Sequence, residues 1–305
     1  MKKSNSNSIK EKIVVVTGSN SGIGYETAMK LAKEGNKVIL ACRNPESGEN
    51  AVKNIGKKTV FMELDVSSIK SIDKFIENFQ DRYPRLDILI NNAGVMLHPP
   101  QKTEDGTEVT FAINYLGYFY LSLKLIPSLI KGINSKIVNV SSISSYHLNG
   151  IDWEYFDPQQ KLSSLKKKIK IYEHTNLFRL MFSIELDKKL KEMDAPIKSI
   201  ACHPGVAKSN LGRYSLLAKI AYTIGIGMAS AKEGARPIIY AATDSNLKGG
   251  EFIGLDTKNQ HKGFPKVVEP NPIANNSKTR SMLWKKTTAK CGIDLKNLKS
   301  LNLKY

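Results

Sequence analysis

The stretch IVVVTGSNSGIG, residues 13–24, decides how the rest of the chain is interpreted. Its β-branched run at 13–16 predicts a buried strand, and the three glycines that follow predict a tight turn opening a helix. Gly18 permits the turn, Gly22 lets the backbone approach a pyrophosphate closely, and Gly24 lets the helix pack on the strand. Because glycine spacing alone is a weak signal, an ordinary strand, turn and helix stays open as the alternative.

The composition is that of a globular chain with a strong basic excess. Of 305 residues, 41% are hydrophobic, and 46 Lys and Arg against 28 Asp and Glu leave a formal net charge of +18. This length suffices for one large α/β domain. The lysines gather at 161–170 and 278–304, which we interpret as a solvated surface, since no basic and aromatic nucleic-acid module is visible. Binding to nucleic acid or to an anionic membrane surface stays the weakest alternative.

The cysteines and the chain start predict a cytoplasmic protein with no metal site. Cys42, Cys202 and Cys291 lie far apart without the spacing of metal ligands, which is typical of reduced thiols. The polar tail at residues 1–11 lacks the apolar core of a signal peptide. The longest mostly apolar stretch, 220–231, is too short and too rich in glycine to cross a bilayer, so we expect no transmembrane segment.

Strands and helices are predicted to alternate through most of the chain. The expected strands are 13–16, 37–41, 59–64, 86–90, 136–140 and 197–202, and the expected helices are 25–33, 69–82, 107–129, 171–191 and 229–242. This alternation predicts an α/β fold, a single Rossmann-type domain at 12–256 with a doubly wound, seven-stranded, mainly parallel sheet. Residues 257–305 are interpreted as a basic C-terminal extension that packs on the domain or on another subunit of a homo-oligomer.

Polar residues follow the predicted strands, at the edge where the carboxyl ends of parallel strands meet and bind ligands. Arg43 follows the second strand, where an acid binds a free ribose 2′-hydroxyl and an arginine suits a 2′-phosphate. It therefore favours NADP(H), with an exposed loop arginine as the alternative. Asp65 follows the third strand and is placed to accept a hydrogen bond from an adenine amine. Alternatively, Asp65 or Ser67 caps the next helix.

Several motifs together resemble the short-chain dehydrogenase/reductase superfamily. They are TGSNSGIG at 17–24, Asp65, NNAG at 91–94, Asn114, Ser142, Tyr172 and HPGV at 203–206, in the family's order. Four further segments resemble the retinol-dehydrogenase-like subgroup: ACRNPESGENA at 41–51, NNAGVM at 91–96, KTEDG at 102–106 and IVNVSS at 137–142. The long insertion between Ser142 and Tyr172 is similar to that subgroup as well.

The resemblance implies hydride transfer between NADP(H) and an apolar carbonyl or alcohol. Tyr172 would be the acid and base, Ser142 would orient the oxygen, and Asn114 would position a water. A strand-end turn at Ser142 and a buried helix kink at Asn114 are the structural alternatives. The implied cofactor-binding residues are Gly18, Ser19, Asn20, Ser21, Gly22, Ile23, Gly24, Arg43, Asp65, Val66, Asn92, Ala93, Gly94, Pro204 and Val206. The apolar segment 211–228 would close over a hydrophobic substrate.

The chain departs from the family pattern at Asn176, where a lysine is expected one helical turn after Tyr172. An ammonium there would stabilise the phenolate. In the first of three hypotheses, Asn176 holds the nicotinamide ribose by a hydrogen bond in a slower reductase. In the second, the site binds NADP(H) with little or no turnover, as a sensor or partner-binding protein. In the third, His174 or a loop lysine from 166–170 supplies the charge, although His174 is predicted to face away from Tyr172 on the helix.

Overall fold

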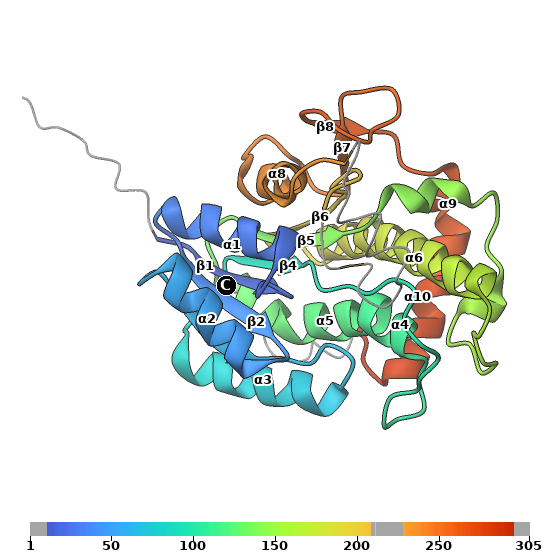
Figure 1. The fold of residues 1–305 in the computed structure, drawn as a ribbon, viewed down its shortest axis with the longest axis horizontal. Helices are drawn as coiled ribbons and strands as arrows, with labels where there is room; N and C mark the ends of the chain where they lie inside the picture. Colours follow the sequence, from blue (N-terminus) through green and yellow to red (C-terminus); the bar gives the residue numbers. More distant parts are fainter. Residues whose placement is uncertain (1–10, 209–210, 212–227, 296–305) are drawn as a thin grey trace, which may run out of the picture.

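The computed structural model describes residues 11–208, 211 and 228–295, which form one central sheet covered by helices on both faces (Figure 1). The strands are β1 (Ile13–Thr17), β2 (Lys37–Cys42), β3 (Thr59–Glu63), β4 (Ile88–Asn91), β5 (Ser135–Val140), β6 (Ile197–Cys202), β7 (Phe252–Leu255) and β8 (Pro265–Val268). The helices are α1 (Gly22–Lys33), α2 (Pro45–Ile55), α3 (Ile69–Arg82), α4 (Val109–Phe111), α5 (Gly117–Ile130), α6 (Leu165–Glu192), α8 (Ala231–Thr243), α9 (Pro272–Asn275) and α10 (Ser277–Cys291). Shorter turns are the π-helical η1 (Ala112–Leu116) and the 3-10 helices η2 (Ile143–His147) and η3 (Trp153–Tyr155).

The sheet is doubly wound, which confirms the predicted Rossmann-type fold. Its strand order is β3-β2-β1-β4-β5-β6-β7-β8, and all neighbours are parallel except β7 and β8. The sheet therefore has eight strands and not the seven expected. The additional strand, β8, lies in residues assigned to the C-terminal extension and pairs antiparallel with β7, with Phe252 opposite Val268.

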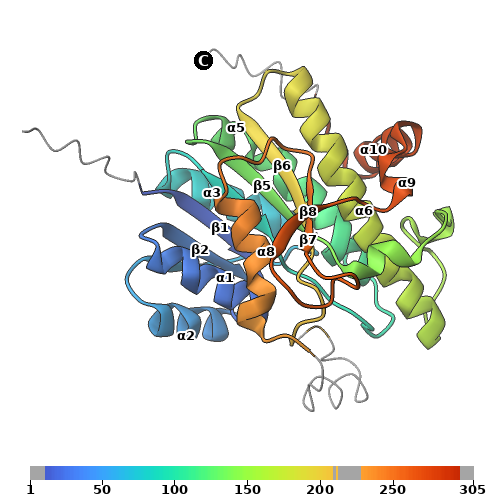
Figure 2. The same cartoon turned by 90° about the horizontal axis from the view of Figure 1, so that it is seen from above.

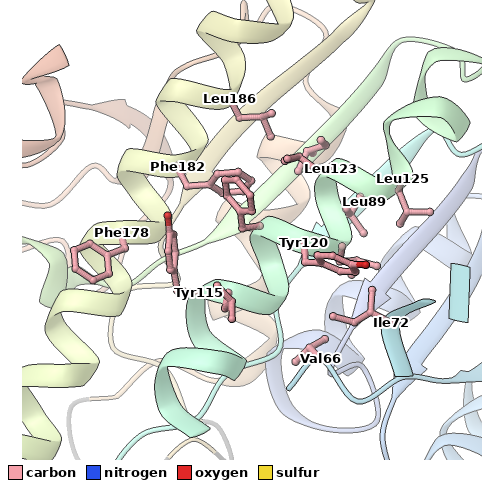
Figure 3. Packing of buried hydrophobic residues seen from close by; sticks show 14 of the residues in the cluster. Val66, Ile72, Leu89, Tyr115, Tyr120, Leu123, Leu125, Phe178, Phe182 and Leu186 are labelled. Atoms are coloured by element: carbon pink, nitrogen blue, oxygen red, sulfur yellow. The ribbon is translucent and has the colours of Figure 1, made fainter. Parts of the chain in front are cut away.

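Helices on both faces explain why the strands are continuous apolar runs rather than alternating ones. Every residue of β1 is buried. The helices α1, α2 and α8 cover one face, and α3, α5 and α6 cover the other (Figure 2). On the second face, Phe178 and Phe182 of α6 lie against the aromatic and leucine side chains of η1 and α5, Tyr115 and Leu123 among them (Figure 3).

The helical stretch Val109–Ile130 is long and apolar enough to cross a membrane by length and composition, but 94% of its most apolar window is buried inside the protein. It runs through α4, η1 and α5, packs on β4 and β5 of the sheet, and is flanked by the neighbouring helices α3 and α6. Its apolar composition is therefore that of a core helix. Most of the stretch 220–231 lies outside the described residues.

Helix α6 begins earlier than predicted, at Leu165 instead of residue 171. The Ser164 side chain caps it by accepting a hydrogen bond from the Lys167 N–H at 3.3 Å. The lysines between 166 and 170 consequently lie on the first turns of this helix and not in a loop.

The described part of the C-terminal segment packs on the domain. Arg280 of α10 is 9% exposed and its Nε lies 3.1 Å from Oε2 of Glu185 on α6. The Trp284 ring lies 5.0 Å from Phe119 and 6.1 Å from Phe182, measured between ring centroids. Helix α10 thereby packs against both α5 and α6.

Candidate active site

A cavity of about 530 Å³ opens along the carboxyl ends of β1 to β6. The predicted residues that line it are Gly18, Asn20, Ser21, Gly22, Ile23, Gly24, Arg43, Asp65, Val66, Asn92, Ala93, Gly94, Ser142, Tyr172, Pro204 and Val206. Three predicted residues lie outside its lining, namely Ser19, Asn114 and Asn176. The parallel strands thus bring together motifs that are far apart in the sequence, because most of these motifs directly follow a strand, while Tyr172 comes from α6.

The glycine turn has the geometry that its sequence predicts. Gly18 and Gly22 have φ angles of +65° and +58°, in the left-handed region that favours glycine. A Cβ on Gly24 would lie 2.4 Å from Nδ2 of Asn92, so helix α1 can approach the strand only with glycine there. Ser19 is fully buried and its hydroxyl donates to the Val16 carbonyl at 2.8 Å, which braces the turn from inside.

The N-terminus of α1 fits the pyrophosphate of a dinucleotide. Ser21 at its cap makes no side-chain hydrogen bond, and the first turn holds no acid. In contrast, a side chain caps each of α2, α3, α6, α8 and α10. Ser21 therefore leaves the first N–H groups of α1 uncapped beside the cavity, and a helix N-terminus of this kind attracts an anion.

Arg43 and Asp65 mark the far end of the cavity. The Arg43 Nη1 lies 3.8 Å from Oδ2 of Asp65, and the arginine side chain is 63% exposed. Oδ1 of Asp65 accepts hydrogen bonds from the Ser67 N–H at 2.9 Å and from the Ser67 hydroxyl at 2.6 Å. The cap of α3 is Ser68, so the alternative that Asp65 or Ser67 caps this helix is wrong.

Ser142 and Tyr172 line the opposite end of the cavity. Ser142 follows β5, caps η2 and accepts a hydrogen bond from the Ser144 N–H at 3.2 Å, so it is a turn residue that also faces the cavity. Tyr172 belongs to α6 and is 7% exposed. The residues Ser142 and Tyr172 thus bring two hydroxyl groups to the end of the cavity formed by β5 and α6.

Asn114 is fully buried in the π-helical turn η1, and its side chain clamps the backbone of Val95. Its Oδ1 accepts from the Val95 N–H at 2.9 Å, and its Nδ2 donates to the Val95 carbonyl at 2.8 Å. These contacts are those of a buried residue in a helix kink, and the positioning of a water by Asn114 stays a prediction. Asn114 thereby fixes the strand-end loop that follows β4.

Asn176 is also fully buried, and its amide does not face the cavity. Its Nδ2 donates to the Tyr172 carbonyl at 2.8 Å, and its Oδ1 accepts from Nη1 of Arg179 at 3.1 Å. The hydrogen bond from Asn176 to a nicotinamide ribose therefore stays a prediction, and the partner that the structure shows for Oδ1 is Arg179.

His174 does not supply the missing charge. Its Nε2 accepts from the Asp152 N–H at 3.1 Å, its Nδ1 lies 2.8 Å from the Lys170 carbonyl, and its ring stacks on Tyr155 at 4.6 Å. Burial lowers the pKa of His174, which favours the neutral ring. Among the nearby lysines, Lys170 pairs with Glu173 at 2.8 Å. Both groups therefore have partners outside the cavity lining.

Arg179 also lines the cavity and was not among the residues expected there. Its side chain is 4% exposed and lies over the ring of Tyr118, 4.5 Å from the centroid. The sequence spacing between Tyr172 and Arg179 indicates this position. The two residues are about two helical turns apart and therefore share one face of α6.

Comparison with known proteins agrees with this fold and site. Residues 12–152 match the family model of the short chain dehydrogenases. The chain is 35% identical to retinol dehydrogenase 13 of Mus musculus over 298 residues, which cover 92% of this chain and 84% of that protein. It is 34% identical to retinol dehydrogenase 12 of Homo sapiens, covering 92% and 87% of the two chains. The chain therefore belongs to the short-chain dehydrogenase/reductase superfamily, in its retinol-dehydrogenase-like subgroup.

Solved structures share the fold. The crystal structure of an uncharacterized protein from Mycobacterium paratuberculosis superposes with a TM-score of 0.75 at 30% identity, covering 91% of this chain and 92% of that one. A 3-ketoacyl-(acyl-carrier-protein) reductase from Brucella melitensis, complexed with NADH, has a TM-score of 0.61 at 22% identity and covers 79% and 95%. The second likeness is one of fold alone.

Proposed function

We propose that this protein is an NADP(H)-dependent oxidoreductase that transfers a hydride between the cofactor and an apolar carbonyl or alcohol. The observation that carries the proposal is the single cavity in which the uncapped α1 N-terminus, Arg43, Ser142 and Tyr172 meet. Tyr172 exchanges the proton with the substrate oxygen, and Ser142 orients that oxygen by a hydrogen bond.

Different charged groups along the cavity would bind different parts of the cofactor. The α1 N-terminus would hold the pyrophosphate, and Asp65 would accept from the adenine amine. Arg43 supports NADP(H) over NAD(H), because its exposed guanidinium is only loosely paired, at 3.8 Å, and is free to bind a 2′-phosphate in two-pronged fashion. The bound cofactor supplies or accepts the hydride.

An apolar substrate is supported by the cavity wall and by the relatives. Met96, Ile113, Ile143 and Leu211 line the cavity together with Ser142 and Tyr172. The relatives named above are retinol dehydrogenases, and retinol is an alcohol on a hydrocarbon body. Most of the expected lid at 211–228, namely residues 212–227, lies outside the described residues.

The test is NADPH oxidation with a panel of apolar aldehydes and ketones. We expect turnover by the native protein and a loss of roughly 100-fold or more in Tyr172→Phe, since general acid catalysis contributes about 10² to 10⁴ in rate. Tyr240→Phe is the matched control, because Tyr240 is on α8 and outside the cavity lining. Equal rates in the native protein and in Tyr172→Phe would contradict the assignment of the acid.

A second function is favoured by one observation, the asparagine at the lysine position. It is an NADP(H)-binding protein with little or no redox turnover, acting as a sensor or binding a partner. Binding of NADPH, followed by its fluorescence, without turnover on the whole panel would favour this second function over the first.

We place the protein in the cytoplasm as part of the proposal. Cys42 and Cys202 are buried free thiols, which fits a reducing compartment. The membrane-length stretch Val109–Ile130 is supported as a core helix by its burial.

A further inference from the structure

The end of the cavity that Ser142 and Tyr172 line is called the reaction end here. It contains a buried cation, Arg179, whose hydrogen-bond partners are neutral. Arg179 donates from Nε to the Asn114 carbonyl, from Nη1 to the Val140 carbonyl at 3.0 Å, and from Nη2 to the Ala93 carbonyl at 3.3 Å. Its remaining side-chain partner, Asn176, is an uncharged amide. A buried charge without a counter-charge is costly, so the folded protein holds this guanidinium in place at the expense of stability.

We infer that Arg179 supplies the positive charge at Tyr172 that the family obtains from a lysine, and that Asn176 positions this arginine. The inference rests on the proposed function and deepens it, because it names the group that makes the tyrosine chemistry feasible in this chain.

Helix geometry allows the longer side chain to act from further away. The seven residues from 172 to 179 span about 10.5 Å along α6, and helical side chains lean toward the N-terminus of their helix. The bond of 3.1 Å from Nη1 to Oδ1 of Asn176 shows that Arg179 reaches back by one turn in this direction. An arginine two turns away thus takes its charge toward the level of the missing lysine.

Arg179 and Tyr172 both line the cavity, and Arg179 lies over the ring of Tyr118. The Tyr118 hydroxyl, on α5, interacts electrostatically with Arg179, with Tyr172 and with Cys202 of β6. Burial raises the pKa of Tyr118 and of Cys202, so both stay neutral and neither competes for the charge. Among the described residues that line the cavity, the one acid is Asp65, which is paired with Arg43 at the far end.

One donor of the guanidinium is left for a ligand. A guanidinium has five N–H groups, and Nη2 has two of them but makes one hydrogen bond to the described residues. A Cβ built on Gly94 would lie 3.3 Å from this Nη2. The glycine of the NNAG motif therefore keeps open the space beside the arginine, and both residues line the cavity.

The positive charge of Arg179 should affect how kcat/KM depends on pH. A guanidinium stays protonated at every accessible pH, whereas an ammonium does not. A cation beside a tyrosine favours the phenolate over the neutral phenol. In the direction of alcohol oxidation, where the phenolate is the base, log kcat/KM should therefore rise at a higher pH once the charge is removed.

The experiment compares Arg179→Gln, which removes the charge and keeps a donor, with Arg179→Lys, which keeps the charge. Asn176→Lys is made in the native and in the Arg179→Gln background, as a double-mutant cycle. Arg280→Gln is the matched control, a buried arginine paired with Glu185 outside the cavity lining. We measure kcat/KM for alcohol oxidation against pH. Tyr172 ionisation is followed by tyrosinate absorbance relative to Tyr172→Phe.

We expect Arg179→Gln to move the midpoint of both titrations upward by about one pH unit or more, and Arg179→Lys to move it less. Asn176→Lys should restore the midpoint in the Arg179→Gln background. In the native background it should give no gain, because it places a second cation next to the guanidinium. Unchanged midpoints in Arg179→Gln would overturn the inference. If that variant does not fold, a large gain from Asn176→Lys in the native protein would overturn it too.

The two proposals can fail separately. Absence of turnover on every substrate, with the midpoint of tyrosinate absorbance still shifted in Arg179→Gln, removes the reductase but keeps the role of Arg179. If turnover is lost in Tyr172→Phe but unchanged in Arg179→Gln, the reductase is kept and the role of Arg179 is removed.

Discussion

His203 is a single buried side chain that holds the turn between β6 and the cavity. Its Nδ1 accepts from the Gly205 N–H at 3.1 Å, and its Nε2 lies 2.8 Å from Oε1 of Gln260, to which it donates. Burial lowers the pKa of His203 to about 4, since the charged ring cannot be solvated there. The turn that presents Pro204 and Val206 to the cavity thus depends on a neutral ring.

At the residue scale we predict that acid destabilises the protein through His203. Between the folded pKa of about 4 and the unfolded value of about 6.5, the unfolded chain binds more protons. The stabilisation is complete above about pH 6.5 and is lost toward pH 4, by roughly 3 kcal/mol. Urea unfolding at about pH 7.5 and 4.5 should show a smaller acid loss in His203→Gln than in the native protein. An equal loss in both, or the same relief in the exposed His261→Gln, would contradict the assignment.

Helix α10 shows how an element at the end of the chain becomes part of the core. Trp284 is 5% exposed and packs against Phe119 of α5 and Phe182 of α6. The buried pair of Arg280 with Glu185 fixes the same helix on α6. Since α6 also carries Tyr172 and Arg179, the C-terminal helix supports the element that positions the reaction end of the cavity.

At the element scale we predict that Trp284→Ala lowers the free energy of unfolding by about 3 to 5 kcal/mol, because it leaves a large void between two buried rings. Met282→Ala on the same helix is the control, since Met282 is 46% exposed and should change stability by less than about 0.5 kcal/mol. Urea denaturation measures both variants. If Trp284→Ala lowered the free energy of unfolding as little as Met282→Ala does, the contribution of α10 to the stability of the core would be contradicted.

The whole molecule is organised around a cavity that spans the carboxyl ends of six strands. One end of the cavity is built from β2 and β3, and the other from β4, β5 and α6. A dinucleotide bound there would contact both halves of the sheet at once. Its binding free energy therefore adds to the stability of the entire fold.

At the scale of the whole molecule we predict that NADPH at about 100 times its Kd raises the free energy of unfolding by about 2.7 kcal/mol. NADH at the same concentration should stabilise less. Arg43→Ser should weaken NADPH binding by roughly 10-fold and leave NADH binding nearly unchanged, since a charge-assisted hydrogen bond contributes about 1.5 to 3 kcal/mol. Titration followed by thermal unfolding measures both cofactors. Equal stabilisation by NADH and NADPH would show that Arg43 does not select the 2′-phosphate.

The elements with strong local signals were predictable. The helix expected at 69–82 is α3 as observed, and the strand expected at 197–202 is β6. The glycine turn follows from φ angles that only glycine adopts readily. The β8 strand was missed because its residues are half-exposed or exposed and form no apolar run. Only its pairing with β7 makes it a strand.

The sequence by itself determined the α/β class, the family and most of the cavity lining, because these depend on apolar runs, glycines and strand-end motifs that are local in the chain. Only the tertiary structure decided the roles of Asn176 and Arg179. A long side chain has many rotamers, and the carbonyls of Ala93, Asn114 and Val140 that select one of them come from three other segments. The position of a charge in the site is therefore set by packing across the whole fold and not by spacing along one helix.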